Sequence, residues 1–251
     1  MSLKVVPLVT APHPPLTDYY PGAELRPEWV RGIFDRTAGD YDRVERALAL
    51  GTGPWYRRRA LRLAGLRPGM RVLDVGVGTG LVATAAASIV ADPTLVTGLD
   101  PSFGMLRCAR VPAGVSLTLG RAEAIPLHDA SVDFLSMGFA LRHLSDLSIV
   151  FSEFFRVLRP GALLCILEIT APASALPRAF LKAYMRGIVP VVARMLARHR
   201  DTPALMRYYW DTIEACVPPQ SVLHTLSAAG FIAVRRDVEL GVFSAYCARK
   251  P

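Results

Sequence analysis

Cysteine is scarce in this chain. The 251 residues include four cysteines, scattered through apolar surroundings: Cys108, Cys165, Cys216 and Cys247. Their spacing matches neither a zinc site nor a redox motif, so we predict no metal site and no disulfide framework. We expect buried free thiols, which are typical of a protein in a reducing compartment.

Long hydrophobic runs are also lacking. The N-terminus carries no basic segment followed by an apolar one, as a secretory signal would. The most apolar stretch, Leu81 to Leu99, is interrupted by Asp92 and Pro93, which excludes a membrane-spanning helix there. We therefore expect a cytoplasmic protein.

Acidic residues are fewer than basic ones. The chain has 29 Lys and Arg against 21 Asp and Glu, which gives a net charge of +8 and a pI near 9.7. This balance favours an acidic partner, which could be nucleic acid, an anionic membrane surface or an anionic small molecule. Apolar residues make up 52% of the chain, so it is globular rather than disordered.

The chain does contain a regular alternation of short apolar runs and amphipathic segments. The five runs that read as strands are 71–76, 95–100, 115–120, 132–140 and 162–170. Helical sequence and short loops separate most of them, which predicts βαβ units and a mostly parallel sheet in an α/β fold. Two last runs, 232–240 and 242–250, should form an antiparallel hairpin through Gly241.

This pattern divides the chain into four parts. Residues 1–65 should form a proline-rich arm and a helical lid, and residues 66–172 a cofactor-binding core. Residues 173–215 interrupt the alternation with helical sequence and should form a cap, whose helix Pro190 should kink or break. Residues 216–251 supply a helix and the hairpin that complete the core sheet.

The most informative motif is the glycine-rich loop "VLDVGVGTG". Its glycines, Gly76, Gly78 and Gly80, follow a strand and precede a helix, where they let the backbone approach a ligand closely. Asp100 ends the next strand, 20 residues after Gly80. A carboxylate at that position can accept hydrogen bonds from both hydroxyls of a ribose.

The spacing of the loop indicates which nucleoside it binds. G-x-G-x-G differs from the dinucleotide pattern, and Asp74 precedes the first glycine by two residues. A zwitterionic nucleoside such as S-adenosylmethionine fits better, with Asp74 near its ammonium group. The turn "GRAEAIPL" at 120–127 should lie beside the adenine, where the backbone N–H of Ala122 could meet a ring nitrogen.

Together these residues resemble the class I S-adenosylmethionine-dependent methyltransferases, and more narrowly the ubiquinone and menaquinone biosynthesis C-methyltransferase family. The superfamily shares "VLDVGVGTG" and "GLDPSFGML". Closer to the quinone family are "FDRTAGDYD", "GFALRHLSD", "FFRVLRPGALLCILEIT" and "YYWDTIEACVPPQ". The resemblance runs from about Phe34 to the C-terminus. It implies a Rossmann-like class I methyltransferase fold, S-adenosylmethionine as cofactor, and methylation of a ring carbon in a polyprenylated hydroxyaromatic substrate.

The resemblance also implies roles for single residues. The implied cofactor-binding residues are Gly76, Gly78, Gly80, Asp100 and Met105, the last packing against the adenosine. Tyr41 would close over the cofactor and substrate, and Arg142 matches an arginine that helps to deprotonate the substrate. Three features depart from the family pattern: Arg121 replaces an Asp or Asn, His143 replaces an Asn, and the first loop reads "GTGPWYRRR".

Arg142 and His143 are candidates for different chemical roles. A phenol ring carbon attacks well only as the phenolate, so a base must take the hydroxyl proton or a cation must stabilise the anion. Arginine is a poor proton acceptor, which favours an electrostatic role for Arg142, whereas His143 could take the proton. Alternatively, Arg142 pairs with Asp146 or Glu168 and His143 caps the next helix. Tyr41 could equally be a packing residue.

The cap segment carries much of the positive charge. No acidic residue occurs from Ile169 to Arg200, and Arg178, Lys182 and Arg186 share one helix face. A basic amphipathic stretch at 178–200 could lie on an anionic membrane, which would suit a lipid-tailed substrate. It could equally be a cap with a solvated basic face.

Other functions also fit the sequence. The same frame could serve an O- or N-methyltransferase of a specialised metabolite, or a non-catalytic protein that binds a membrane or partner. Nucleic acid is disfavoured as a substrate, because the turn after the fourth strand lacks the Asn/Asp-Pro-Pro-aromatic pattern of amino-methylating enzymes and has no nearby cysteine. The sequence does not predict an oligomeric state.

Overall fold

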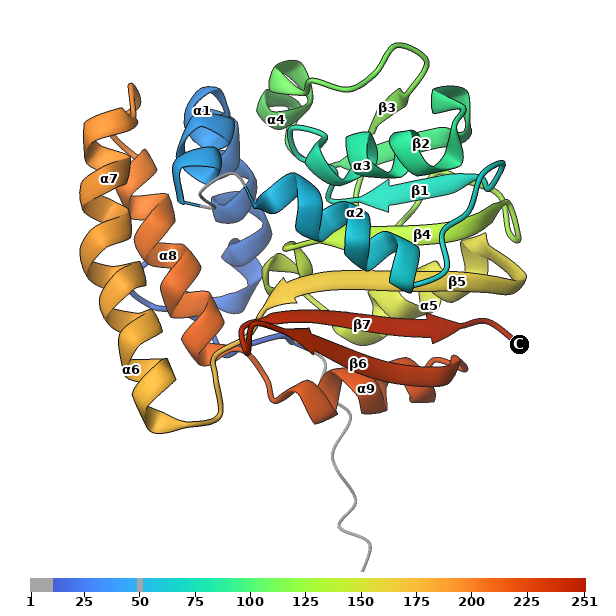
Figure 1. Cartoon of the computed structure of the whole chain (residues 1–251). Coiled ribbons are helices and arrows are strands. Elements are labelled where there is room, and N and C mark those ends of the chain that lie inside the picture. The colour runs from blue at the N-terminus through green and yellow to red at the C-terminus, as the bar shows by residue number, and fades with distance from the viewer. Residues whose placement is uncertain (1–10, 49–51) are drawn as a thin grey trace, which may run out of the picture.

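The computed structural model describes residues 11–48 and 52–251, so part of the predicted arm lies outside the described residues. A seven-stranded sheet with the order β3-β2-β1-β4-β5-β7-β6 forms the centre (Figure 1). Its strands are β1 (Val72–Val75), β2 (Val96–Asp100), β3 (Ser116–Leu119), β4 (Val132–Gly138), β5 (Leu158–Ile169), β6 (Ile232–Glu239) and β7 (Phe243–Arg249). β1 to β5 pair in parallel, while β7 pairs antiparallel with β5 and β6. The predicted α/β sheet and its C-terminal hairpin are confirmed.

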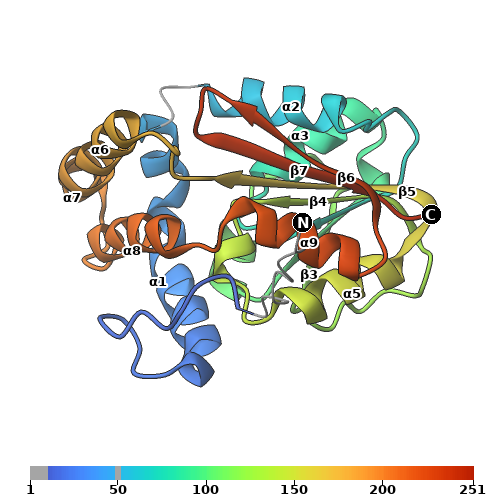
Figure 2. The same cartoon turned by 90° about the horizontal axis from the view of Figure 1, so that it is seen from below.

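Helices cover both faces of this sheet (Figure 2). One face carries α2 (Gly53–Leu63) and α3 (Leu81–Val90), and the other carries α5 (Leu147–Val157) and α9 (Pro219–Ala228). Parallel strands need this cover, because both of their faces are apolar. β1 accordingly consists of four fully buried residues.

The helix α2 belongs to this covering layer, although the boundary at residue 65 assigned it to the lid. Tyr56, Ala60 and Leu61 of α2 are buried in the same cluster as Val72 and the alanines of α3. The helical period of α2 was predictable from the sequence, but the surface that its apolar side meets depends on the tertiary arrangement.

The strand order determines where a ligand can bind. β1 lies between β2 and β4. The chain moves outward from β1 through β2 to β3 on one side and then crosses back to β4 on the other side. A crevice opens outside the carboxyl ends of parallel strands at such a switch point. The loops after β1, β2 and β4 are therefore the expected walls of a site.

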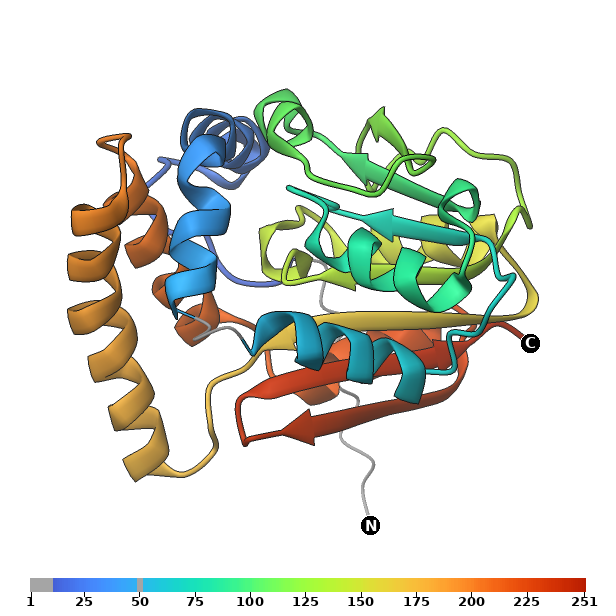
Figure 3. The same cartoon turned by 45° about the horizontal axis from the view of Figure 1, so that its top comes forward.

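A separate layer of helices lies beyond that edge of the sheet (Figures 1 and 3). It contains α1 (Arg26–Leu48), α6 (Ala175–Ala183), α7 (Val189–Leu196) and α8 (Thr202–Ala215). Its own core includes Tyr20, Met206 and Trp210. The shorter elements of the chain are α4 (Phe103–Cys108) and the single turns η1 (Ala23–Leu25), η2 (Pro93–Leu95) and η3 (Leu141–His143).

The helix at the outer edge of this layer does not break at Pro190. α6 runs into a π-helical turn, η4 (Tyr184–Ile188), and then into α7. Pro190 lies in the first turn of α7, where its missing N–H is tolerated. The expected distortion is instead the π-helical turn just before Pro190, and α6, η4 and α7 form one rod (orange, Figure 1).

In the described part of the chain, no helix has both the length and the apolar character needed to cross a membrane.

Candidate active site

The glycine loop connects β1 to α3 with an unusual backbone. Gly76, Gly78 and Gly80 have φ angles of 68°, 55° and 92°, in the left-handed region that favours glycine. A Cβ atom on Gly80 would lie 2.3 Å from a methyl carbon of Val111, so a side chain there is excluded. A Cβ on Gly76 would lie 2.8 Å from the Cβ of Ala140 after β4. The loop is therefore pressed against its neighbours.

Asp100, at the end of β2, is held by the same loop. One carboxylate oxygen accepts from the backbone N–H of Gly78 and the other from that of Ser102, each at 2.8 Å. Burial raises the pKa of Asp100 to about 6, although these two N–H groups oppose the shift. Each oxygen retains further lone pairs, so the carboxylate can accept hydrogen bonds from a ligand.

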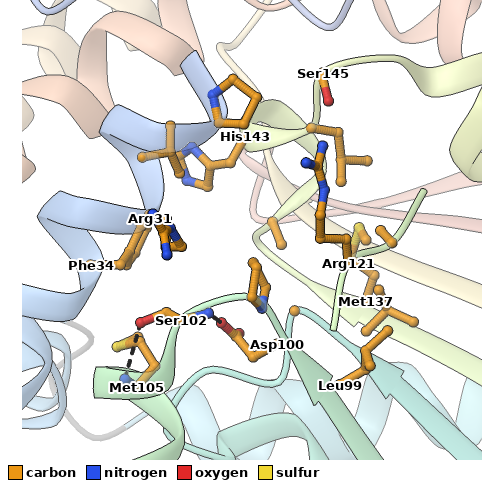
Figure 4. A pocket seen from close by; sticks show the side chains of 18 of the residues that line it. Arg31, Phe34, Leu99, Asp100, Ser102, Met105, Arg121, Met137, His143 and Ser145 are labelled. Carbon is orange, nitrogen blue, oxygen red and sulfur yellow. Dashed lines mark hydrogen bonds between the residues drawn. The ribbon is translucent and has the colours of Figure 1, made fainter. Parts of the chain in front are cut away.

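A cavity of about 770 Å³ opens at this edge of the sheet. Six of the predicted site residues line it: Tyr41, Gly76, Asp100, Met105, Ala122 and His143. Figure 4 shows Asp100, Met105 and Leu99 at one end and His143 and Ser145 at the other. The sheet thus builds one end of the cavity, which contains the predicted cofactor-binding residues, and the helical layer contributes to the other end.

Asp74 does not line the cavity. Its carboxyl group is buried, and one oxygen accepts from the hydroxyl of Ser136 at 2.7 Å. Burial raises the pKa of Asp74 to about 7. Gly78 and Gly80 are likewise absent from the wall formed by the described residues, so they shape the loop rather than face the cavity.

Arg142 is also absent from that wall. It is 2% exposed, its guanidinium forms an ion pair with the buried carboxylate of Glu168, and its Nε donates to the hydroxyl of Thr212 at 3.1 Å. The guanidinium lies 5.2 Å from the ring centre of Tyr209, which does line the cavity. The pairing with Glu168, one of the two alternatives above, is the one observed.

His143 does line the cavity, within an aromatic cluster. Its ring stacks on Tyr208 at 5.4 Å and meets Phe34 edge-on at 5.3 Å, with Tyr209 at 5.7 Å. Nδ1 lies 3.4 Å from the Tyr208 hydroxyl, whereas the buried Nε2 has no partner among the described residues. Burial, followed by the charge of Arg142, lowers the pKa of His143 well below its usual value, so the imidazole is neutral. Asp146, not His143, caps α5.

The family is decided by comparison with known proteins. The profile of the ubiE/COQ5 methyltransferase family matches residues 23–250. The chain belongs to this family.

Named relatives agree with this membership. The chain is 33% identical over 235 residues to the ubiquinone/menaquinone biosynthesis C-methyltransferase UbiE of Syntrophotalea carbinolica, covering 91% of this chain and 95% of that protein. It is 35% identical over 209 residues to the demethylmenaquinone methyltransferase of Lactiplantibacillus plantarum, covering 80% and 87%. A crystal structure of an S-adenosylmethionine-dependent methyltransferase from Thermotoga maritima aligns with a TM-score of 0.61 at 21% identity, covering 88% and 99%, and shows the shared fold.

This member of the ubiE/COQ5 family is therefore an S-adenosylmethionine-dependent methyltransferase, and the non-catalytic alternative is set aside. Two observations fit the cofactor. The glycine loop has a left-handed backbone in which a Cβ on Gly76 or Gly80 would clash with neighbouring side chains. The buried Asp100 carboxylate at the end of β2 can still accept further hydrogen bonds. Among the described residues, no group of three His, Cys, Asp or Glu side chains could hold a metal ion.

Three residues of the cavity wall in this methyltransferase were not predicted from the sequence. Arg31 and Phe34 from α1, and Tyr209 from α8, line it. Phe34 and Tyr209 both fall within quoted family motifs, so a signal was present. Arg31 carried no such signal, because its position depends on how α1 lies over the carboxyl edge of the sheet.

Proposed function

We propose that this methyltransferase transfers a methyl group to a ring carbon of a hydroxylated, quinol-like aromatic substrate with a lipophilic tail. The observation that carries the proposal is the aromatic end of the cavity, where Phe34, Tyr41, Tyr209 and the neutral His143 line the wall. Rings of this kind receive a flat aromatic substrate by stacking. The names of the relatives, a C-methyltransferase and a demethylmenaquinone methyltransferase, support the same substrate class.

The cofactor would occupy the other end. Asp100 would accept hydrogen bonds from the ribose hydroxyls, Met105 would pack against the adenosine, and the N–H of Ala122 would meet the adenine. Gly76 would lie beside the amino acid portion, which Asp74 would influence from beneath the loop. When bound, S-adenosylmethionine supplies an activated methyl group on a sulfonium centre.

His143 is the residue that we assign to the substrate hydroxyl. The imidazole is neutral, and a rotation of its ring that turns the buried, unpartnered Nε2 toward the cavity would let it accept the hydroxyl proton as the ring carbon becomes nucleophilic. The methyl group would pass to that carbon as its bond to sulfur breaks, and loss of the ring proton would restore the aromatic ring. The burial of His143 weakens it as a base, but burial also keeps it unprotonated and ready to accept.

Arg142 would act through Tyr209 rather than on the substrate itself. Its guanidinium pairs with Glu168 behind the cavity wall and packs against the ring of Tyr209. The side chains of Tyr209 and Tyr41 are joined by a hydrogen bond, so Arg142 would help to fix both aromatic walls. We therefore assign Arg142 as a positioning residue and Tyr41 as part of the substrate enclosure.

A second candidate is transfer to the substrate oxygen, which the same His143 Nε2 favours, because it would also generate a phenolate for O-methylation. Nucleic acid stays outside the proposal.

The test is incubation of the protein with methyl-labelled S-adenosylmethionine and a panel of demethylated benzoquinols and naphthoquinols. We expect label in the organic product, and none with Asp100→Ala, whose loss of cofactor binding calorimetry would register. Failure to label any ring in the panel, with cofactor binding intact, would overturn the proposal.

A further inference from the structure

The rod formed by α6, η4 and α7 presents an apolar stripe to solvent. Its five exposed large apolar side chains are Leu176, Phe180, Ile188, Val191 and Met195, which are 82%, 76%, 55%, 58% and 80% exposed. By contrast, Met185, Val189 and Ala193 on the same rod are buried against α1 and α8. Contiguous exposed apolar side chains on one element mark an interaction surface more often than isolated ones do.

The π-helical turn improves the alignment of this stripe. An α-helix turns about 100° per residue, so the five side chains would spread over an arc of about 120° on a regular helix. A π turn inserts about one residue into the repeat and rotates everything after it back by about 100°. The same five positions then fall within an arc of about 80°. The turn η4, which precedes Pro190, thus brings the apolar residues of α7 into line with those of α6.

The basic residues of the rod and of the turn after it fall into two groups. Arg178, Lys182 and Arg186 turn toward α8, where the first two approach Glu214 at 4.0 and 2.9 Å and the third pairs with Asp211 at 2.8 Å. Arg194 in α7 and Arg198 in the turn that follows have no ion-pair partner among the described residues. The expected basic face at 178–200 is thus largely neutralised by α8 in its first half, and the outward surface is apolar with free positive charge at one end.

We infer that this stripe is a docking surface for an anionic lipid bilayer. An interfacial helix buries its apolar side among the acyl chains while arginine side chains meet the anionic head groups. The rod is the outermost element of the helical layer in all three views, so nothing described covers it (Figures 1, 2 and 3). The inference does not rest on the reaction proposed above, although a bilayer is where a lipid-tailed substrate would reside.

The charge distribution favours a bilayer over a second copy of the chain. In a symmetric dimer through the stripe, Arg194 and Arg198 would face their own copies if the rods ran parallel, or the Leu176 end of the partner if they ran antiparallel. No acidic residue lies between Ile169 and Arg200, so neither arrangement brings a carboxylate of the rod to them. An anionic surface complements this charge.

The test is flotation of the full-length protein with vesicles of phosphatidylglycerol and phosphatidylcholine, and with phosphatidylcholine alone. We expect binding to the anionic vesicles that falls at least tenfold in the variant Leu176→Ser/Phe180→Ser/Met195→Ser. Arg194→Gln/Arg198→Gln should weaken binding to anionic vesicles and flatten its salt dependence. The matched control is Ile149→Ser/Val238→Ser, which removes exposed apolar side chains from α5 and β6 and should bind like the wild type.

Two results would overturn the inference: a wild type that does not float with anionic vesicles, or a triple variant that floats as well as the control. Sedimentation of the wild type as a dimer that the triple variant disperses, without vesicle binding, would assign the stripe to self-association instead. Turnover of a tail-less, water-soluble quinol separates the two proposals. It should be equal in the wild type and the triple variant, and its absence in both would count against the reaction alone.

Discussion

The buried pair of Arg142 and Glu168 offers a test of which residue meets the substrate. The two side chains are 2% and 1% exposed, so removing either partner leaves the other charge or polar group buried alone. We expect Arg142→Met and Glu168→Gln each to lower the free energy of unfolding by about 3–5 kcal/mol. In the double variant the amide oxygen introduced by Glu168→Gln can still accept from the N–H of Ile169, as the Glu168 carboxylate does at 2.8 Å. The double variant should therefore recover to within about 2 kcal/mol of the wild type.

The pH dependence of the free energy of unfolding provides a second test of the same pair. Burial raises the pKa of Glu168, and the charge of Arg142 opposes that shift. Without the arginine the folded-state pKa rises further above its unfolded value, so stability is retained at low pH and lost as the pH rises through the folded pKa. Arg142→Met should thus be most destabilised, relative to wild type, at alkaline pH. Urea denaturation across pH measures this.

The activity of the double variant shows whether Arg142 positions Tyr209 or stabilises charge on the substrate directly. If Arg142 acts through Tyr209, the double variant should keep its cofactor Kd and lose less than about tenfold in kcat, whereas loss of a direct charge stabiliser costs about 10²–10³-fold. The exposed pair Arg235 and Asp237, 3.2 Å apart, is the matched control and should show coupling below about 1 kcal/mol. A double variant that is as unstable as the worse single variant would contradict a mutually compensating pair, and one that folds but loses more than about 100-fold in kcat would contradict the positioning role of Arg142.

Three further predictions concern the cavity and the loop. Because burial raises the pKa of Asp100 to about 6, cofactor affinity by calorimetry should be full above about pH 7 and fall as the pH drops through 6; constant affinity down to about pH 5 would contradict this. His143→Asn should lower kcat by about 10²-fold with cofactor Kd unchanged, and full activity would remove His143 from the mechanism. Gly80→Ala should cost at least about 1 kcal/mol more in thermal unfolding than Gly69→Ala, because both glycines have positive φ but only Gly80 is pressed against Val111; equal costs would count against the packed loop.

Local signals in the sequence were sufficient for the sheet and the cofactor end of the cavity. The glycine loop and Asp100 lie at consecutive strand ends, and parallel strands bring such ends together. Their contact through the N–H of Gly78 follows from that order. The orientation of Asp74 was harder to predict. Its carboxyl group lies beneath the loop because of the strand face on which it sits and its hydrogen bond with Ser136.

The aromatic end depended on contacts distant in sequence. Glu168 reaches Arg142 because β5 pairs with β4 at Leu167 and Gly138, and Tyr209 reaches Arg142 from α8. The sequence allowed the ion pair as an alternative but could not choose it. The same holds for Lys182, whose partner Glu214 lies 32 residues away on another helix. Helical spacing indicates which residues share a face, and tertiary packing decides what that face meets.

The atom that receives the methyl group distinguishes ring methylation from transfer to oxygen. Carbon-13-methyl S-adenosylmethionine is incubated with the protein and a demethylated naphthoquinol, and the product is examined by two-dimensional NMR. We expect a methyl group bonded to a ring carbon, with its protons coupled to neighbouring ring carbons, and markedly less product with His143→Asn. A methyl group on oxygen, or equal product from His143→Asn and the wild type, would contradict it.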